Sequence, residues 1–344
     1  MNGKNVAAYY VGDNKFSLET APIYRPLSQE VQVAIAYCGI CGTDMHVYGG
    51  HMDQRVGKHR VIGHEMSGVI TEVGSDVFNL QVGDPVVVRP LQHCGKCSTC
   101  QRGLTHICEN LKFLGLDSDG AFQQYWTVPA HTIHKLPPNL PLSDAAIVEP
   151  LAVACHDVDR ARVCKNEDVL VIGAGPIGLL IAMVARESGA NVIVSEVDPK
   201  KIRYTKSLGF TVVNASLPGQ EASLLSKTNQ KGFDVIFDAS GVQAAVDLFT
   251  KVSATRARIC MVAIHTNKPQ IDLFKFFWQE LELIGARVYE SKDFDKAISL
   301  LANKQILPEH IVTGIKPLKE IQKAFTPKKT LNIKTLISVT PELV

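Results

Sequence analysis

The hydrophobic and polar positions change their pattern near the middle of the chain. In the first part, apolar residues alternate with polar ones in short segments separated by glycine and proline, which is typical of strands. These expected strands cover 31–35, 69–73 and 85–88. From about Asp157 onwards, apolar runs alternate with helical segments, which predicts a parallel, doubly wound sheet. Its expected strands cover 169–172, 192–195, 234–237 and 258–262.

This alternation of strands and helices ends near Gly285. The tail predicts two amphipathic helices, at 295–303 and 318–325, and a last strand at 333–339. A lone strand needs a sheet to complete, so we expect the tail to return to the first domain. The pattern therefore predicts an α/β protein of two domains, in which the first domain contains both ends of the chain.

Composition excludes several classes of partner. The chain has 344 residues, 46% of them hydrophobic, and a formal net charge of +2. Basic and acidic residues are mixed throughout, which gives no electrostatic reason to expect nucleic acid or an anionic membrane as a partner. The N-terminus does not resemble a secretory signal, and the apolar helices are too short to span a bilayer. We therefore expect a cytoplasmic protein with reduced cysteines.

Four cysteines form a cluster with the spacing C-x2-C-x2-C-x7-C. They are Cys94, Cys97, Cys100 and Cys108. Thiols so close in sequence do not pair easily as disulfides, but their thiolates can converge on one metal site. Zinc and iron–sulfur clusters both accept four thiolates. Because the run leaves no position open for a substrate, we expect a structural metal site.

A glycine-rich turn follows the expected strand at 169–172 and begins a helix. The turn reads Gly173-Ala174-Gly175-Pro176-Ile177-Gly178. In this context it predicts a dinucleotide site, where glycine lets the backbone approach a pyrophosphate at the helix N-terminus. Glu196, at the end of the next strand, is placed to bind the ribose hydroxyls and to repel a 2′-phosphate, which favours NAD over NADP. Lys200 and Lys201 weaken that preference, and Lys201 is a candidate cofactor contact.

A second candidate metal site comes from two separate segments. Cys38 and Cys41 lie in the first segment, and His64 and Glu65 lie in the second. One thiolate, one imidazole and one carboxylate would leave a fourth zinc position open, which is typical of a catalytic zinc. Such a zinc would polarise an alcohol oxygen. The hydroxyl of Thr43 and the imidazole of His46 suit a proton relay to solvent.

The sequence resembles the zinc-dependent medium-chain alcohol dehydrogenases, and within them the polyol branch with its sorbitol, threonine and butanediol dehydrogenases. The resemblance runs nearly end to end, through 40–46, 63–68, 94–108, 120–125, 149–151, 173–178 and 283–287. It implies a GroES-like, mainly β catalytic domain at 1–152 and 288–344, and a Rossmann NAD-binding domain at 153–287. It also implies one catalytic and one structural zinc per chain.

The same resemblance assigns residues at the sites. It makes Cys41 the zinc ligand together with His64, and it makes Glu65 a ligand or a close partner. Glu149 corresponds to a glutamate that hydrogen-bonds the zinc-bound water and can approach the metal. By alignment, the nicotinamide is flanked by Val262, Ala263, Ile264, Ala286 and Arg287. A homodimer or homotetramer follows from the resemblance alone, and the apolar cluster at 274–278 is expected at a subunit or domain junction.

One segment departs from the family pattern. The family usually has a glycine–lysine pair before its last strand, whereas 330–337 contains no glycine. We expect this departure to affect a turn far from the chemistry.

The function expected from the sequence is hydride transfer from a secondary alcohol of a polyol or sugar-derived substrate to NAD. The alternatives are a threonine or butanediol dehydrogenase of the same mechanism, a nucleotide-binding protein without catalytic metal, and an iron–sulfur electron carrier. A substrate that bears a carboxylate would need a nearby cation, for which Arg55, Lys58 and Arg60 are candidates.

Overall fold

The structure is a computed structural model that describes residues 4–326 and 330–343. The chain divides into two compact units. Unit 1 comprises Met1–Glu149 with Glu290–Val344, and unit 2 comprises Pro150–Tyr289. The domain limits expected from the sequence, after residues 152 and 287, differ from these by three and two residues.

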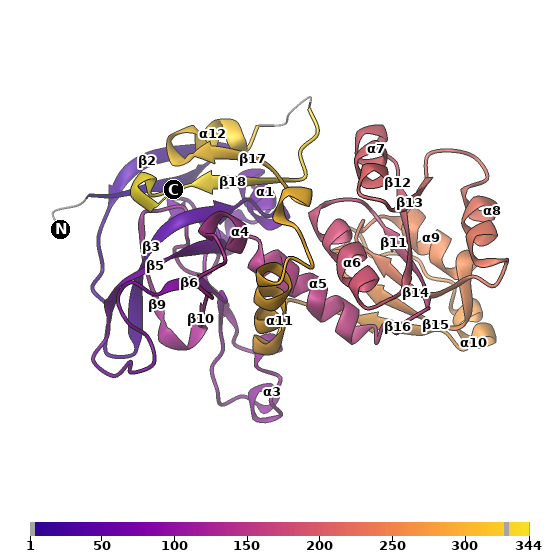
Figure 1. Cartoon of the computed structure of the whole chain (residues 1–344), viewed down its shortest axis with the longest axis horizontal. Helices are drawn as coiled ribbons and strands as arrows, with labels where there is room; N and C mark the ends of the chain where they lie inside the picture. The colour runs from indigo at the N-terminus through magenta and orange to yellow at the C-terminus, as the bar shows by residue number, and fades with distance from the viewer. Residues whose placement is uncertain (1–3, 327–329, 344) are drawn as a thin grey trace. The chain divides into compact units, whose positions relative to one another are not determined.

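Unit 1 is built mainly from short antiparallel strands (Figure 1). Its largest sheet has seven strands in the order β10-β6-β5-β3-β18-β17, with β9 also paired to β3. These strands are β3 (Glu30–Gly39), β5 (Glu65–Val73), β6 (Pro85–Val88), β9 (Tyr125–Pro129), β10 (Ile133–Lys135), β17 (Val312–Pro317) and β18 (Lys334–Ser338). A second sheet, β2-β1-β4, contains β1 (Asn5–Gly12), β2 (Lys15–Ala21) and β4 (Arg60–Val61), and β7 (Leu91–Gln92) pairs with β8 (Lys112–Phe113). The three strands expected in the first part of the chain are confirmed.

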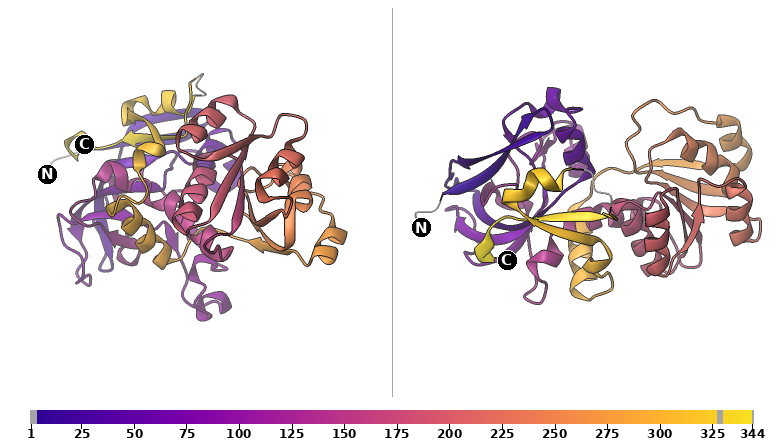
Figure 2. Two further views of the ribbon diagram at one scale, coloured as in Figure 1. Left: turned by 45° about the vertical axis from the view of Figure 1, so that its right-hand side comes forward. Right: turned by 90° about the horizontal axis from the view of Figure 1, so that it is seen from above.

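The last strand, β18, lies against β3 in both views of Figure 2. It pairs antiparallel with β3, where Leu336 faces Gly39, and parallel with β17. The Ile40 N–H donates to Thr335 O at 3.0 Å just beyond the ladder. The predicted return of the tail to the first domain is thereby confirmed, and it brings the start of β18 beside residues 40 and 41.

The helices of unit 1 are short except for α11. They are α1 (Gly42–Tyr48), α2 (Asp53–Val56), α3 (Ser98–Gln101), α4 (Leu142–Ala145), α11 (Ser291–Ala302) and α12 (Ile321–Ala324), with 3-10 turns at Thr105–Ile107, Ala130–Thr132, Pro308–His310, Leu318–Glu320 and Pro341–Leu343. The single helix expected at 318–325 is therefore a 3-10 turn followed by one α-helical turn. Its apolar side still packs as expected, because Phe325 contacts the rings of Phe16 and Tyr48. The helix expected at 295–303 is confirmed as α11.

Unit 2 contains one sheet in which every pairing is parallel. The strand order is β13-β12-β11-β14-β15-β16, which is the Rossmann order. The strands are β11 (Asp168–Ile172), β12 (Asn191–Glu196), β13 (Thr211–Asn214), β14 (Phe233–Asp238), β15 (Ser253–Met261) and β16 (Glu282–Gly285). The four strands expected in this region are confirmed, and β13 and β16 are additional short strands.

Helices lie on both faces of this sheet, with α6 on one side and α9 on the other in Figure 1. The helices are α5 (Val148–Arg160), which begins at the end of unit 1, α6 (Pro176–Glu187), α7 (Pro199–Ser207), α8 (Gln220–Leu225), α9 (Gln243–Val252) and α10 (Leu273–Gln279), with a 3-10 turn at Ser226–Thr228. Parallel strands place their carboxyl ends at one edge, so Ile172, Glu196, Asp238 and Met261 end their strands at that edge. Among the described residues, no helix has both the length and the apolar character needed to cross a membrane.

Candidate active site and metal centres

Cys41 is held at the start of helix α1 by the residues that follow it. It is the N-cap of α1, where its Sγ accepts a hydrogen bond from Thr43 N at 3.5 Å. Its own N–H donates to Asp44 Oδ2 at 2.8 Å, which completes a capping box. The other oxygen of the buried Asp44 lies 3.6 Å from His64 Nδ1. The local sequence therefore fixes the thiol and places a carboxylate behind the imidazole.

The two segments that the sequence left separate come together in unit 1. Cys41 Sγ, one ring nitrogen of His64 and one carboxylate oxygen of Glu65 lie within 4.8 Å of one another. A thiolate, an imidazole and a carboxylate are all ligands that zinc accepts, so the donor set fits this metal. Cys38 lies outside this group, and its complete burial raises the pKa of its thiol well above the usual range. Cys38 is therefore suited to packing rather than to metal binding.

The segment 330–337, which was expected to lie far from the chemistry, contributes a residue to this site, so that expectation was wrong. Lys334 Nζ is 2.7 Å from both carboxylate oxygens of Glu65 and 3.0 Å from Ile40 O. The side chains of Lys334 and Glu65 are only 2% and 1% exposed. The available signal was a single lysine between the apolar residues Ile333 and Leu336, near the start of the expected last strand.

The buried charged groups around the candidate metal ligands shift one another's pKa values. Burial by itself lowers the pKa of His64, but Asp44 and Cys41, with Glu149, hold that pKa well above its usual value. Burial also opposes the charge of Lys334, whose pKa is nevertheless raised, first by Glu65. Glu149 is buried and does not belong to the group formed by Cys41, His64 and Glu65. Its charge nevertheless contributes to raising the pKa of both His64 and Lys334.

The two relay candidates lie on one side of helix α1. Thr43 and His46 are three residues apart, a spacing that places their side chains on the same face of a helix. Thr43 is half-buried beside the cysteine, whereas His46 is exposed. The ring of His51 lies 5.9 Å from that of His46, centroid to centroid. This arrangement suits a path from the half-buried Cys41 towards the surface, and no sequence motif associates His51 with it.

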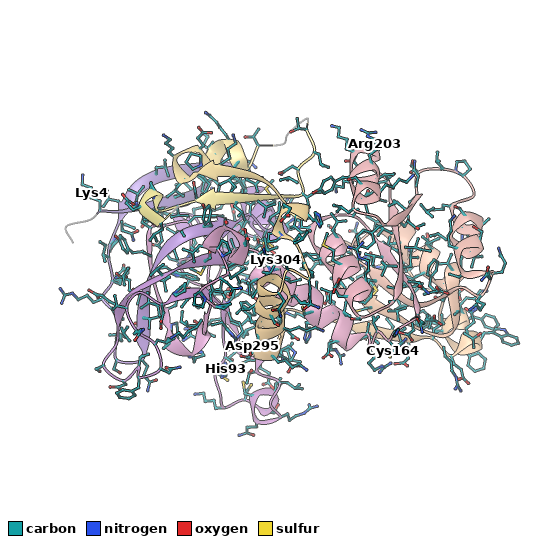
Figure 3. All side chains as sticks on the ribbon, viewed as in Figure 1. Lys4, His93, Cys164, Arg203, Asp295 and Lys304 are labelled. Atoms are coloured by element: carbon teal, nitrogen blue, oxygen red, sulfur yellow. The ribbon has the colours of Figure 1, made fainter. Side chains whose placement is uncertain are left out.

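The four clustered cysteines converge as expected. The Sγ atoms of Cys94, Cys97, Cys100 and Cys108 lie within 4.8 Å of one another, and all four residues are free thiols. Backbone N–H groups point at the sulfurs, as from Cys100 N to Cys97 Sγ at 3.4 Å. Such bonds favour the thiolate, and the N–H groups of Lys96 and Cys97 lower the pKa of Cys94 to about 6. His93, labelled in Figure 3, precedes this lobe. A closed four-thiolate set suits a structural zinc.

The glycine turn requires glycine for reasons that the backbone shows. Gly173 has a φ of +106°, and a Cβ on Gly178 would lie 2.0 Å from Gly173 O. Helix α6 begins at Pro176 directly after this turn. Glu196 Oε2 accepts a hydrogen bond from Ala174 N at 2.7 Å, which connects the end of β12 to the turn. A pocket of about 190 Å³ is lined by residues that include Gly173, Glu196 and Ser240. These groups fit the pyrophosphate and ribose sites of a dinucleotide.

Two domain families match the chain. Residues 28–138 match the alcohol dehydrogenase GroES-like domain, and residues 176–303 match the zinc-binding dehydrogenase domain. A 2-dehydro-3-deoxy-L-galactonate 5-dehydrogenase of Pseudoalteromonas atlantica is 49% identical over 319 residues, which cover 93% of this chain and 94% of that protein. The chain belongs to the zinc-dependent alcohol dehydrogenase family.

Solved structures of similar dehydrogenases match this one over nearly its whole length. Galactitol-1-phosphate dehydrogenase of Escherichia coli is 27% identical, with a TM-score of 0.89 and coverage of 97% of this chain and 99% of that chain. A dehydrogenase of Escherichia coli CFT073, described as a short chain alcohol dehydrogenase complexed with NADH, is 29% identical, with a TM-score of 0.91 and coverage of 98% and 100%. The protein is therefore an oxidoreductase of the alcohol and polyol dehydrogenase class. The predicted combination of a GroES-like domain and a Rossmann domain is confirmed.

The residues expected to flank the nicotinamide of this dehydrogenase lie at one edge of the unit 2 sheet. Val262, Ala263 and Ile264 follow β15, and Ala286 and Arg287 follow β16. The two segments are neighbours, because the Ala286 N–H donates to Met261 O at 3.3 Å. Ile264 is 91% exposed, so it offers an apolar surface to a flat ring.

Sequence reasoning missed a buried carboxylate beside these residues. Asp238 is completely buried at the end of β14, and its Oδ2 lies 2.9 Å from His265 Nε2. Its other oxygen accepts hydrogen bonds from Ser240 and from Gly241 N. Asp238 thereby connects two loops at the carboxyl edge of the sheet. Lys201, the other expected cofactor contact, lies half-buried in the first turn of α7.

Glu196 predicts a preference for NAD over NADP, so replacing it by serine should weaken NAD binding and narrow the expected difference between the two cofactors. The change removes a carboxylate that fits the ribose hydroxyls and also frees Ala174 N. Loss of a hydrogen bond to a charged group amounts to about 1.5–3 kcal/mol, so the KM for NAD should rise about 10- to 100-fold. Steady-state kinetics with both cofactors measures this. Glu187→Ser, at the exposed end of α6, is the control, and an unchanged KM for NAD in Glu196→Ser would contradict the assignment.

Proposed function

We propose that the protein is an NAD-dependent zinc dehydrogenase that oxidises a secondary alcohol of a polyol or a sugar-derived substrate. The observation that carries the proposal is the convergence of Cys41, His64 and Glu65 in unit 1. Three protein ligands leave one zinc position for a substrate oxygen, as catalytic zinc sites require. The position of Glu196 at the glycine turn supports NAD as the cofactor.

Each proposed residue has a defined task. Zinc, when bound by Cys41, His64 and Glu65, would supply Lewis acidity that polarises the alcohol oxygen. Oxidation removes a hydride and a proton from the alcohol, and NAD is the proposed hydride acceptor. The Thr43 hydroxyl would accept the proton of the alcohol as it releases its own proton towards His46, and His46 would pass a proton to solvent. Glu149 would stay close to the metal ligands as a second carboxylate.

The type of substrate is proposed from the relatives. One relative is named for a sugar acid and one solved structure for a polyol phosphate. Two of the cations considered for a substrate carboxylate already have carboxylate partners: Arg55 binds Asp117 at 2.8 and 2.9 Å, and Arg60 lies 3.4 Å from Asp119. Because of these ion pairs, we do not expect Arg55 and Arg60 to bind a substrate carboxylate. The substrate is then either an uncharged polyol or a sugar acid whose carboxylate binds elsewhere in the site.

Two measurements test the proposed function. Absorbance of the reduced cofactor should rise with at least one member of a panel of polyols, polyol phosphates, sugar acids and L-threonine in the presence of NAD. Metal analysis should give two zinc ions per chain, one for the Cys41 group and one for the four cysteines. One zinc and no activity would favour a nucleotide-binding protein without catalytic metal. A coloured, iron-containing preparation would favour an iron–sulfur protein.

We further propose a homodimer or homotetramer that uses the region of α10. This helix exposes Phe274, Phe277 and Trp278 at 64%, 77% and 70%, beside the edge strand β16. Large exposed apolar patches are typical of interaction sites. A cytoplasmic location and the absence of nucleic acid and membrane partners stay predictions from composition.

A further inference from the structure

Lys334 is a buried lysine whose three donors are all used at the candidate zinc site. An ammonium group has three N–H donors and no acceptor. Here they are directed at Glu65 Oε1 and Oε2, each at 2.7 Å, and at Ile40 O at 3.0 Å. Ile40 directly precedes the ligand Cys41. One side chain from the last strand therefore contacts one metal ligand and the residue before another.

The Glu65 carboxylate is confined from a second direction. In the ladder between β3 and β5, Glu65 faces Gly39. A Cβ on Gly39 would lie 2.2 Å from Glu65 Oε2, so the carboxylate occupies space that only glycine leaves free. Gly39 also faces Leu336 across the ladder with β18, which fixes Lys334 two residues away. The backbone thus sets the positions of both the carboxylate and the lysine.

We propose that Lys334 is a positioning residue that orients the Glu65 carboxylate for zinc and couples it to the Cys41 loop. The inference rests on the proposed zinc site and deepens it. A carboxylate has about four lone-pair sites, so two bonds from Lys334 leave others for a metal. Partners that orient metal ligands in this way typically contribute about 10- to 100-fold to metal affinity. Lys334 also neutralises a carboxylate that would otherwise be buried with its charge unpaired.

Lys334→Met tests the proposal through zinc affinity measured by competition with a chelator. The zinc bound by Cys41, His64 and Glu65 should be held about 10- to 100-fold more weakly. The zinc of the four-cysteine lobe should be unaffected, which provides a control within the same molecule. Lys316→Met is the matched control variant, because Lys316 lies on the neighbouring strand β17 with a side chain 42% exposed. Unchanged affinity at the first site in Lys334→Met would overturn the proposal.

A double-mutant cycle with Glu65→Gln separates positioning from a general effect on folding. Removal of the lysine alone leaves the Glu65 charge buried, whereas the double variant Lys334→Met/Glu65→Gln removes both charges and should unfold at a higher temperature than Lys334→Met alone. If Lys334 acts through Glu65, the lysine substitution should change zinc affinity little in the Glu65→Gln background. An equally large loss in both backgrounds would overturn the proposal. A wild-type protein that binds only the lobe zinc would instead refute the proposed function.

Discussion

Cys41→Ser should abolish catalysis while leaving the fold intact. Serine is a favourable N-cap residue, so its hydroxyl can still accept from Thr43 N and helix α1 should form as before. The hydroxyl does not replace a thiolate as a zinc ligand, and the Lewis acidity of that metal is then lost. Because such polarisation contributes several kcal/mol, kcat/KM should fall about 1,000-fold or more. Metal analysis should show that one of two zinc ions is lost, together with a nearly unchanged circular dichroism spectrum.

Cys38→Ala is the matched control for this change. Cys38 is completely buried three residues before Cys41 and belongs to the pair that the sequence alone could not separate. Its loss should reduce stability through a small cavity but should leave both zinc ions bound. Full activity in Cys41→Ser, or loss of the first zinc in Cys38→Ala, would show that the ligand is assigned to the wrong cysteine.

The elements with a local pattern were predictable from the sequence. The run at 169–172, the glycine turn and helix α6 are contiguous, and each step has a local physical reason that the sequence displays. The four cysteines were predictable for the same reason, because Cys94 and Cys108, the first and last of the group, are only 14 positions apart. Where the expectation for 318–325 was wrong, the apolar spacing was right, but it is satisfied by a 3-10 turn followed by α12.

The contacts that build the active site depend on residues far apart in the chain. Lys334 and Glu65 are separated by 269 positions, and no periodicity relates them. The pairing of β18 with β3 brings them together, and the register of that pairing can be known only from the fold. The same applies to Asp44 and His64, which meet only because β5 lies beside β3. Family resemblance predicted the ligands but gave no information on the residues that position them.

Buried charge is concentrated at this site in unit 1. Asp44, His64, Glu65 and Lys334 are all nearly inaccessible, and they come from three separate parts of the chain. Buried ion pairs contribute little to stability when desolvation is counted, so stability alone does not explain their presence. Perturbed ionisable groups gather at functional sites. The concentration of charge therefore supports the metal site independently of the ligand pattern.

Thr43→Val should slow the reaction without disturbing the metal. Valine has nearly the shape of threonine but lacks the hydroxyl proposed to accept the proton of the alcohol. The backbone bond from residue 43 to Cys41 Sγ does not involve the side chain, so both zinc ions should remain bound. Proton transfer by a positioned group contributes about 10²- to 10⁴-fold, and kcat should fall by a factor in this range. Stopped-flow measurement of cofactor reduction checks the chemical step directly.

Thr43→Ser is the control that decides how this loss is interpreted. Serine keeps the hydroxyl and removes one methyl group, so its kcat should stay within about tenfold of the wild type, a change of about 1.4 kcal/mol or less. The relay also predicts that His46→Ala is slower than the wild type and is partly rescued by added imidazole, because exposed His46 is accessible to a small base. If Thr43→Val reduces cofactor as fast as Thr43→Ser, the hydroxyl does not carry the proton, and the proposed path from Thr43 to His46 would have to be abandoned.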